Sequence, residues 1–118
     1  CMYSAPRTVI LNVGGVLFTT LHDTLTKYDS FFSGLLTTQS SSESIFVDRD
    51  PTHFRHILNY MRGTPTHPND INSTEQLAQE AEFYSLVAFA NILRKEIETM
   101  QKESIHEQLR LLTNKINF

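Results

Sequence analysis

Two histidines stand three residues apart in the segment PTHFRHIL, a spacing at which two imidazoles can share a metal ion. His53 and His56 would lie close together on a helix that follows Pro51. A metal site also needs a third ligand and an oriented partner, and no matching Asp, Glu or Cys stands at a diagnostic spacing. We therefore expect both histidines to face solvent or a neighbouring subunit, and we expect no metal site and no cofactor.

The glycine pair in NVGGVLFTT is the second candidate for chemistry, because glycine-rich loops cradle phosphate groups. A Walker-type loop needs a lysine after its last glycine, and no such lysine follows Gly15. A dinucleotide-binding loop needs a third glycine and an immediate long helix, whereas VLFTT has the character of a strand. Gly14 and Gly15 instead predict a structural turn between two strands, since primed hairpin turns require positive φ angles.

Other catalytic arrangements find little support in the sequence. Serine, histidine and aspartate are present, but no G-x-S-x-G elbow or comparable local pattern arranges them as a hydrolase triad. The single cysteine, Cys1, excludes a disulfide and a cysteine-cluster metal site within one chain, and we assign it no function. The sequence therefore predicts a protein that is not an enzyme.

Composition narrows the class of protein and of partner. The chain has 118 residues, of which 40% are hydrophobic and 19% charged, and these values fit one globular domain. The net charge of -3, without a dense Lys/Arg block, gives no reason to expect nucleic acid as a partner. No apolar run approaches the roughly 18–20 residues that span a bilayer, so we expect no membrane and a cytoplasmic or nuclear location.

Three charged residues are concentrated in FVDRDP, between a predicted strand and a predicted helix. In a local interpretation Asp50 is the N-cap of the helix that starts at Pro51, and Asp48 and Arg49 form a solvated pair. In a second interpretation Asp48, Arg49 and Asp50 pair with a neighbouring subunit, where an arginine fork fixes the register of the contact. The residues alone leave both open.

Two aromatic residues, Phe83 and Tyr84, end a predicted helix. Tyr84 shares a helix face with Leu77 and Ala81, so we expect it in the core. Phe83 lies on a different face, and an exposed aromatic side chain at such a place is a candidate anchor for a partner protein.

Apolar spacing and turn residues predict the elements that position these side chains. Phe54, Ile57, Leu58 and Met61 recur at helical spacing and should face the core, and Gly63 should end their helix. We expect strands at 8–13 and 16–20, and then two short helices within 21–36, the first capped by Asp23 or Thr24 and the second by Asp29 or Ser30. A loop at 37–44 and a strand at 44–48 should precede the helix from Pro51. After that helix we expect a two-proline loop at 64–72 and a helix capped by Ser73 or Thr74.

The last third of the chain, from Leu86 onward, contains no proline or glycine and carries apolar residues at spacings of mostly three and four. One interval of five separates Met100 from Ile105 and indicates a domain edge. We therefore predict a domain over residues 8–102, a helical C-terminal extension over 103–118, and a disordered or vector-derived N-terminus over 1–7.

Four stretches in this order resemble the BTB/POZ domain of the potassium-channel tetramerisation-domain (KCTD) family. They are VILNVGGVLFTT, TLTKYDSFFSGLL, IFVDRDPTHFRHILNYMRG and EAEFYSL, and the resemblance covers residues 8 to about 98. It implies an α+β fold, in which a small three-stranded sheet meets a cluster of α-helices. The related channel domains often hold zinc through one His and three Cys, a set that this chain lacks.

The resemblance also implies a function. Domains of this family associate as rings, commonly tetramers or pentamers, and many recruit the ubiquitin ligase scaffold cullin-3. By analogy Asp48, Arg49 and Asp50 fall on the oligomer interface, and Phe83 falls where such domains face cullin-3. We expect a homo-oligomerising protein-interaction module that is a substrate adaptor of a cullin-3 ubiquitin ligase. The alternative is a self-assembly domain that sets the stoichiometry of a channel or scaffold without binding a ligase.

Overall fold

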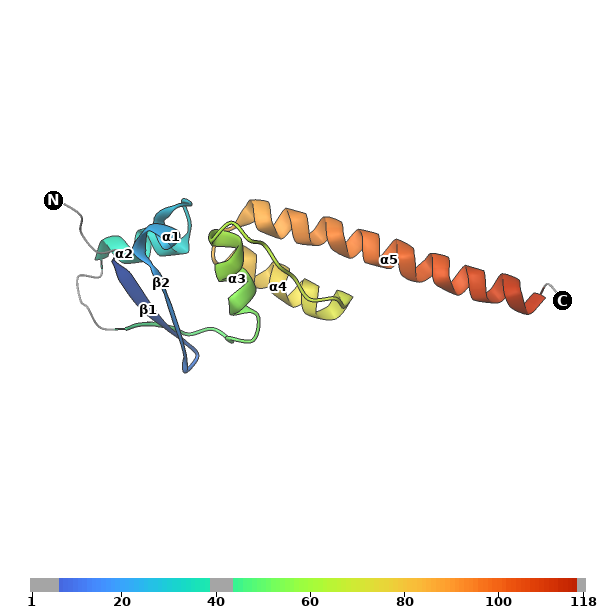
Figure 1. Ribbon diagram of the computed structural model, residues 1–118, viewed down its shortest axis with the longest axis horizontal. Coiled ribbons are helices and arrows are strands. Elements are labelled where there is room, and N and C mark those ends of the chain that lie inside the picture. Colours follow the sequence, from blue (N-terminus) through green and yellow to red (C-terminus); the bar gives the residue numbers. More distant parts are fainter. Residues whose placement is uncertain (1–6, 39–43, 117–118) are drawn as a thin grey trace.

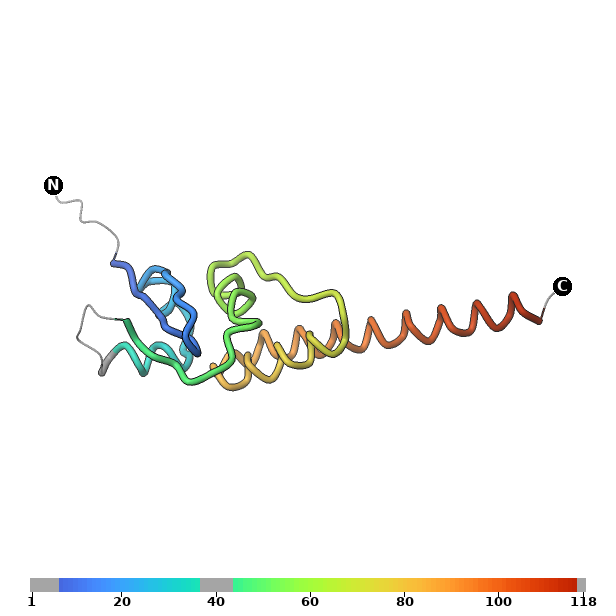
Figure 2. The backbone as a smooth tube through the Cα atoms, turned by 90° about the horizontal axis from the view of Figure 1, so that it is seen from below, coloured from blue at the N-terminus to red at the C-terminus, as the bar shows by residue number. Residues whose placement is uncertain are grey.

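The computed structural model describes residues 7–38 and 44–116, which form a small mixed sheet, four shorter helices and one long helix (Figure 1). The molecule measures 75 × 32 × 20 Å, and its length comes from the last helix, which projects away from the rest (Figures 1 and 2). The elements are β1 (Thr8–Val13), β2 (Val16–Leu21), α1 (His22–Thr26), α2 (Phe31–Thr38), β3 (Ile45–Val47), α3 (Phe54–Met61), α4 (Ile71–Phe83) and α5 (Val87–Ile116). This arrangement confirms the expected α+β class.

The three strands lie in the order β2-β1-β3, with β2 antiparallel and β3 parallel to β1. Side chains alternate between the two faces of the sheet, as the period of a strand requires. Leu11 and Val13 point into the core with Ile45 and Val47, where residues of all five helices join them. In the described part of the chain no helix buries the opposite face of the sheet, and its large apolar side chains are exposed.

The turn between β1 and β2 consists of Gly14 and Gly15, as expected. Both have positive φ angles, +56° and +102°, which fit a primed hairpin turn, and the amide of Gly15 donates to Asn12 Oδ1 at 2.8 Å. The Gly14 amide donates to the carbonyl of Val47 at 3.0 Å. A β-carbon on Gly14 would overlap the carbonyl oxygen of Arg49, so the turn packs directly against the backbone of FVDRDP.

The start of α3 differs from the expectation that Asp50 caps a helix beginning at Pro51. The carboxylate of Asp50 accepts from the amide of Thr52 at 2.8 Å and from its hydroxyl, which lowers the pKa of Asp50. Pro51 to Phe54 form a separate turn, closed by the Phe54 amide on the carbonyl of Pro51, and the helix begins only at Phe54. The predicted inward face of the helix is confirmed, since its buried residues are Phe54, Ile57, Leu58 and Met61. The prediction that Gly63 ends the helix is also confirmed, and its φ angle is +90°.

Two other predicted helix caps are wrong and one is confirmed. Asp23 and Thr24 lie inside α1, because β2 runs straight into this helix without a side-chain cap. Asp70, rather than Ser73 or Thr74, caps α4 by accepting from the Ser73 amide at 2.8 Å. The hydroxyl of Ser30 does accept from the Phe32 amide at 3.2 Å at the start of α2.

Tyr84 is fully buried, as expected, and holds the helices together. Its ring stacks on Phe32 at 5.1 Å between centroids and meets Phe54 edge-on at 5.3 Å. Burial raises the pKa of its hydroxyl, which has no hydrogen-bond partner in the described part of the chain. Ser85 follows with a φ of +62° and turns the chain into α5.

The helix α5 runs without interruption through the interval between Met100 and Ile105. Its buried residues, which pack into the domain, end at Ile97. The boundary at residue 102 therefore coincides with no break in the helix and stays a prediction. Among the described residues no helix combines the length and apolarity needed to cross a membrane.

We expect Gly14→Ala to lower the free energy of unfolding by about 2–4 kcal/mol. The new β-carbon would overlap the Arg49 carbonyl oxygen, and an alanine is strained at the positive φ angle of this position. Gly34→Ala is the matched control: a β-carbon at this helical position meets no atom within 4 Å, so we expect a gain of about 0.5–1 kcal/mol. Urea denaturation at one protein concentration measures both. Equal effects of the two substitutions would contradict the close approach of the turn to Arg49.

Candidate protein-interaction surface

The outward face of the sheet exposes large apolar side chains. Ile10, Leu17, Leu21 and Phe46 occupy it, with exposed fractions of 38%, 62%, 39% and 62%. Leu17 and Phe46 flank Asn12 on the two neighbouring strands, so they lie side by side across β1. We call these four residues the outer sheet face. Contiguous apolar surface of this kind is typical of a site where another protein binds.

Arg49, two residues after β3, is the centre of a second cluster. Its Nε donates to Glu80 Oε1 at 3.2 Å, and its Nη2 donates to the other oxygen of the same carboxylate. The guanidinium also lies 4.1 Å from the ring centroid of Phe83. Hydrogen bonding to Glu80 is the main reason that the pKa of Arg49 is raised. We call Arg49, Glu80 and Phe83 the arginine cluster.

The predicted triad of charges therefore has three different surroundings. Asp50 accepts hydrogen bonds within the turn before α3, and Arg49 is bound by Glu80 of its own chain. Asp48 is exposed at the end of β3. Their part in an oligomer interface stays a prediction. Asp48 and Asp50 are both exposed, whereas Arg49 is half-buried.

Phe83 is 40% exposed and is held from two sides. The ring of Phe31 lies 5.2 Å away and the guanidinium of Arg49 covers part of its surface. Such a side chain loses little conformational freedom on binding, which is a property of good interface anchors. Sequence reasoning missed Glu80, which binds Arg49; its position three residues before Phe83 on the same helix was a local signal.

The two histidines act as local links between elements. His53 Nε2 lies 3.0 Å from Gln76 Oε1 of α4, and His56 Nδ1 lies 2.7 Å from the hydroxyl of Thr66 in the two-proline loop. Burial lowers the pKa of His56. Residues 7–38 and 44–116 contain no group of three or more His, Cys, Asp or Glu that could hold a metal ion.

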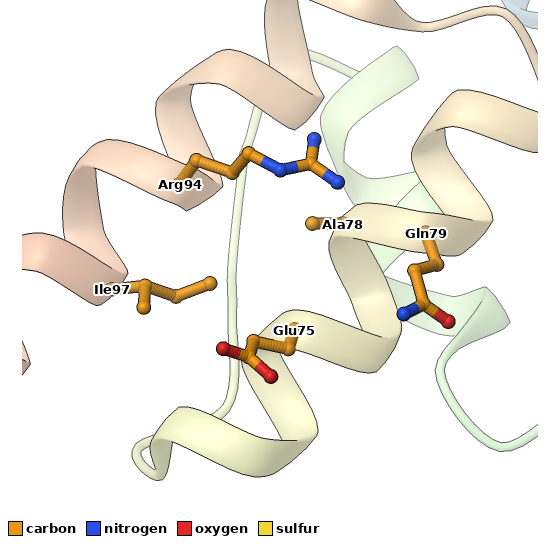
Figure 3. A pocket seen from close by; sticks show the side chains of 5 residues that line it. All are labelled: Glu75, Ala78, Gln79, Arg94 and Ile97. Carbon is orange, nitrogen blue, oxygen red and sulfur yellow. The ribbon is translucent and has the colours of Figure 1, made fainter.

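A hollow of about 380 Å³ lies between α4 and α5. Glu75, Ala78 and Gln79 of α4 line one side, and Arg94 and Ile97 of α5 line the other (Figure 3). Most of these side chains are exposed, and Arg94 is held by an ion pair of 3.0 Å with Glu82. Small-molecule sites are deeper and mainly apolar, so this hollow is a surface groove between two packed helices.

Comparison with known sequences identifies relatives of the whole domain. The family model described as "BTB/POZ domain" matches residues 9–92. SH3KBP1-binding protein 1 of Rattus norvegicus is 43% identical over 97 residues, covering 76% of this chain and 14% of that protein. BTB/POZ domain-containing protein KCTD21 of Homo sapiens is 37% identical over 103 residues, covering 80% of this chain and 40% of that protein. The chain thus spans less than half the length of either relative.

We expect Arg49→Glu to lower the free energy of unfolding by about 1–2 kcal/mol, because it places a second carboxylate beside Glu80 and uncovers Phe83. The double variant Arg49→Glu with Glu80→Arg restores an opposite pair and should recover at least half of that loss. Urea denaturation of the two single variants and the double variant measures the coupling. Additive losses would mean that Arg49 and Glu80 do not form a pair in solution.

Proposed function

Because the chain belongs to the BTB/POZ domain family, we propose that it is a homo-oligomerising module that acts as a substrate adaptor for a cullin-3 ubiquitin ligase. The family supports the general part of this proposal, a domain for self-association and protein interaction. The exposed outer sheet face is the observation that supports the proposal most strongly, since an apolar surface of this kind requires a covering partner. A cytoplasmic or nuclear location accords with this role.

The outer sheet face is the proposed contact between subunits. In a closed ring each subunit offers one surface to the next subunit and a different surface to the previous one. The apolar side chains of Leu17 and Phe46 would supply hydrophobic burial, and Asp48 at the end of β3 would add a charged contact at the margin. A ring of four or five subunits is part of the proposal.

Phe83 is the proposed anchor for cullin-3. It is exposed on α4, while its neighbours Phe31 and Arg49 fix its orientation. A ring would present several such anchors together, and multivalent presentation raises the apparent affinity of a weak individual site. The adaptor role accordingly depends on self-association.

We expect the chain to have a solution mass of four or five times 13.6 kDa by light scattering. Leu17→Lys combined with Phe46→Lys should reduce this mass, because buried lysines would oppose the contact while both positions are exposed in the single chain. Ile92→Lys is the matched control, since Ile92 is 56% exposed on α5 away from the sheet, and it should leave the mass unchanged. A monomeric wild-type chain would contradict self-association.

We expect the N-terminal region of cullin-3 to be captured by the wild-type chain at micromolar concentration. Phe83→Ala should weaken capture at least tenfold while light scattering still finds the oligomer, because the anchor is lost and the sheet is untouched. Ile92→Ala, which truncates another exposed apolar side chain, is the control. Absence of wild-type binding would remove the ligase role and leave the alternative, a self-assembly domain that sets stoichiometry.

A further inference from the structure

The C-terminal half of α5 extends beyond the domain without support from it. Ile97 is the last buried residue of α5, Met100 is half-buried, and every residue from Gln101 to Ile116 is exposed. No other described element lies beside this part of the helix (Figures 1 and 2). An isolated helical segment of this length is marginal in water, so its stability calls for a partner.

Four apolar side chains form a stripe along this segment. They are Ile105, Leu109, Leu112 and Ile116, at intervals of four, three and four, with exposed fractions of 57%, 56%, 54% and 75%. Alternating intervals of four and three are the spacing of the a and d positions of a coiled coil. We call these four residues the seam.

The seam lies on a different side of α5 from the residues that pack into the domain. At 100° per residue, the average direction of the seam is rotated by roughly 115° from that of Phe89, Ala90, Leu93 and Ile97. Lys102 interrupts the apolar pattern one turn before Ile105. The seam is therefore no continuation of the packing within the domain and requires a separate partner.

The residues beside the seam favour a second copy of the same segment. The flanking e and g positions are occupied by Gln101, His106, Gln108, Thr113 and Lys115, of which Lys115 alone is a Lys, Arg, Asp or Glu. Glu103, Glu107 and Arg110 lie on the outer side, where the Arg110 guanidinium and the Glu107 carboxylate bond to each other. Identical helices can therefore meet along the seam without rows of like charge facing each other.

We propose that residues 103–116 of the subunits assemble through the seam as a parallel helical bundle that extends from the oligomer. This inference rests on the proposed self-association, because about two heptads are too short to associate alone. Attachment to a self-associating domain supplies the high effective concentration that a short seam needs. The bundle would stabilise the oligomer.

Disulfide cross-linking tests the position of the seam. In the full chain with Cys1→Ser, Leu112→Cys should give covalent dimers under mild oxidation, because seam residues of neighbouring helices meet. Glu107→Cys is the control on the outer side and should cross-link at least tenfold less. Comparable yields at both positions, or none at Leu112→Cys, in a chain that light scattering finds oligomeric would overturn the bundle alone. A monomeric mass would instead overturn the self-association on which it rests.

Charge insertion tests the contribution of the seam to assembly. Leu109→Glu with Leu112→Glu should raise the concentration for half dissociation at least tenfold, because carboxylates would be brought together in the bundle. Leu111→Glu changes an equally exposed leucine outside the seam and should alter this concentration less than twofold. Sedimentation velocity over a dilution series measures the three proteins. The proposal would be overturned if the double variant and Leu111→Glu changed this concentration equally, or if neither changed it.

Discussion

The close approach of Gly14 to the backbone of Arg49 is the constraint on which both candidate surfaces depend. The Gly14 amide binds the carbonyl of Val47, and the absence of a side chain at Gly14 lets the Arg49 carbonyl lie against the turn. This contact fixes the path of the chain as it leaves β3. Phe46 of the outer sheet face precedes this contact in the chain, and Arg49 of the arginine cluster is part of it. A glycine pair that resembles a phosphate loop thus has a structural role.

Arg49 links the two surfaces physically. Its backbone contacts the hairpin turn of the sheet, whereas its side chain binds Glu80 and covers the ring of Phe83. A change that moves the segment 48–50 would therefore also move the anchor proposed for cullin-3. We therefore expect the proposed subunit contact and the proposed cullin-3 site to be coupled through the contacts of Arg49. The seam on α5 is separate from both, since it lies beyond the last buried residue of the helix.

Local patterns in the sequence predict the features that depend on neighbouring residues. The glycine pair predicted the hairpin, and the spacing of Phe54, Ile57, Leu58 and Met61 predicted the inward face of α3. Helix starts were harder to predict. Asp50 precedes α3 and Asp70 precedes α4, and only the surrounding turn decides whether the carboxylate caps the helix that follows. The pair between Arg49 and Glu80 joins residues 31 apart. Sequence spacing cannot predict such a contact without the fold that brings Glu80 of α4 beside the segment that follows β3.

The central claim is that the outer sheet face of each copy is buried against a neighbouring copy of this chain. Hydrogen–deuterium exchange above and below the dissociation concentration tests it most directly, because each peptide reports its own protection. The account predicts slower exchange in β2 and in residues 44–50 of the associated chain, with little change in the part of α5 that packs on α4. Protection confined to other elements, with β2 and residues 44–50 unchanged, would contradict it.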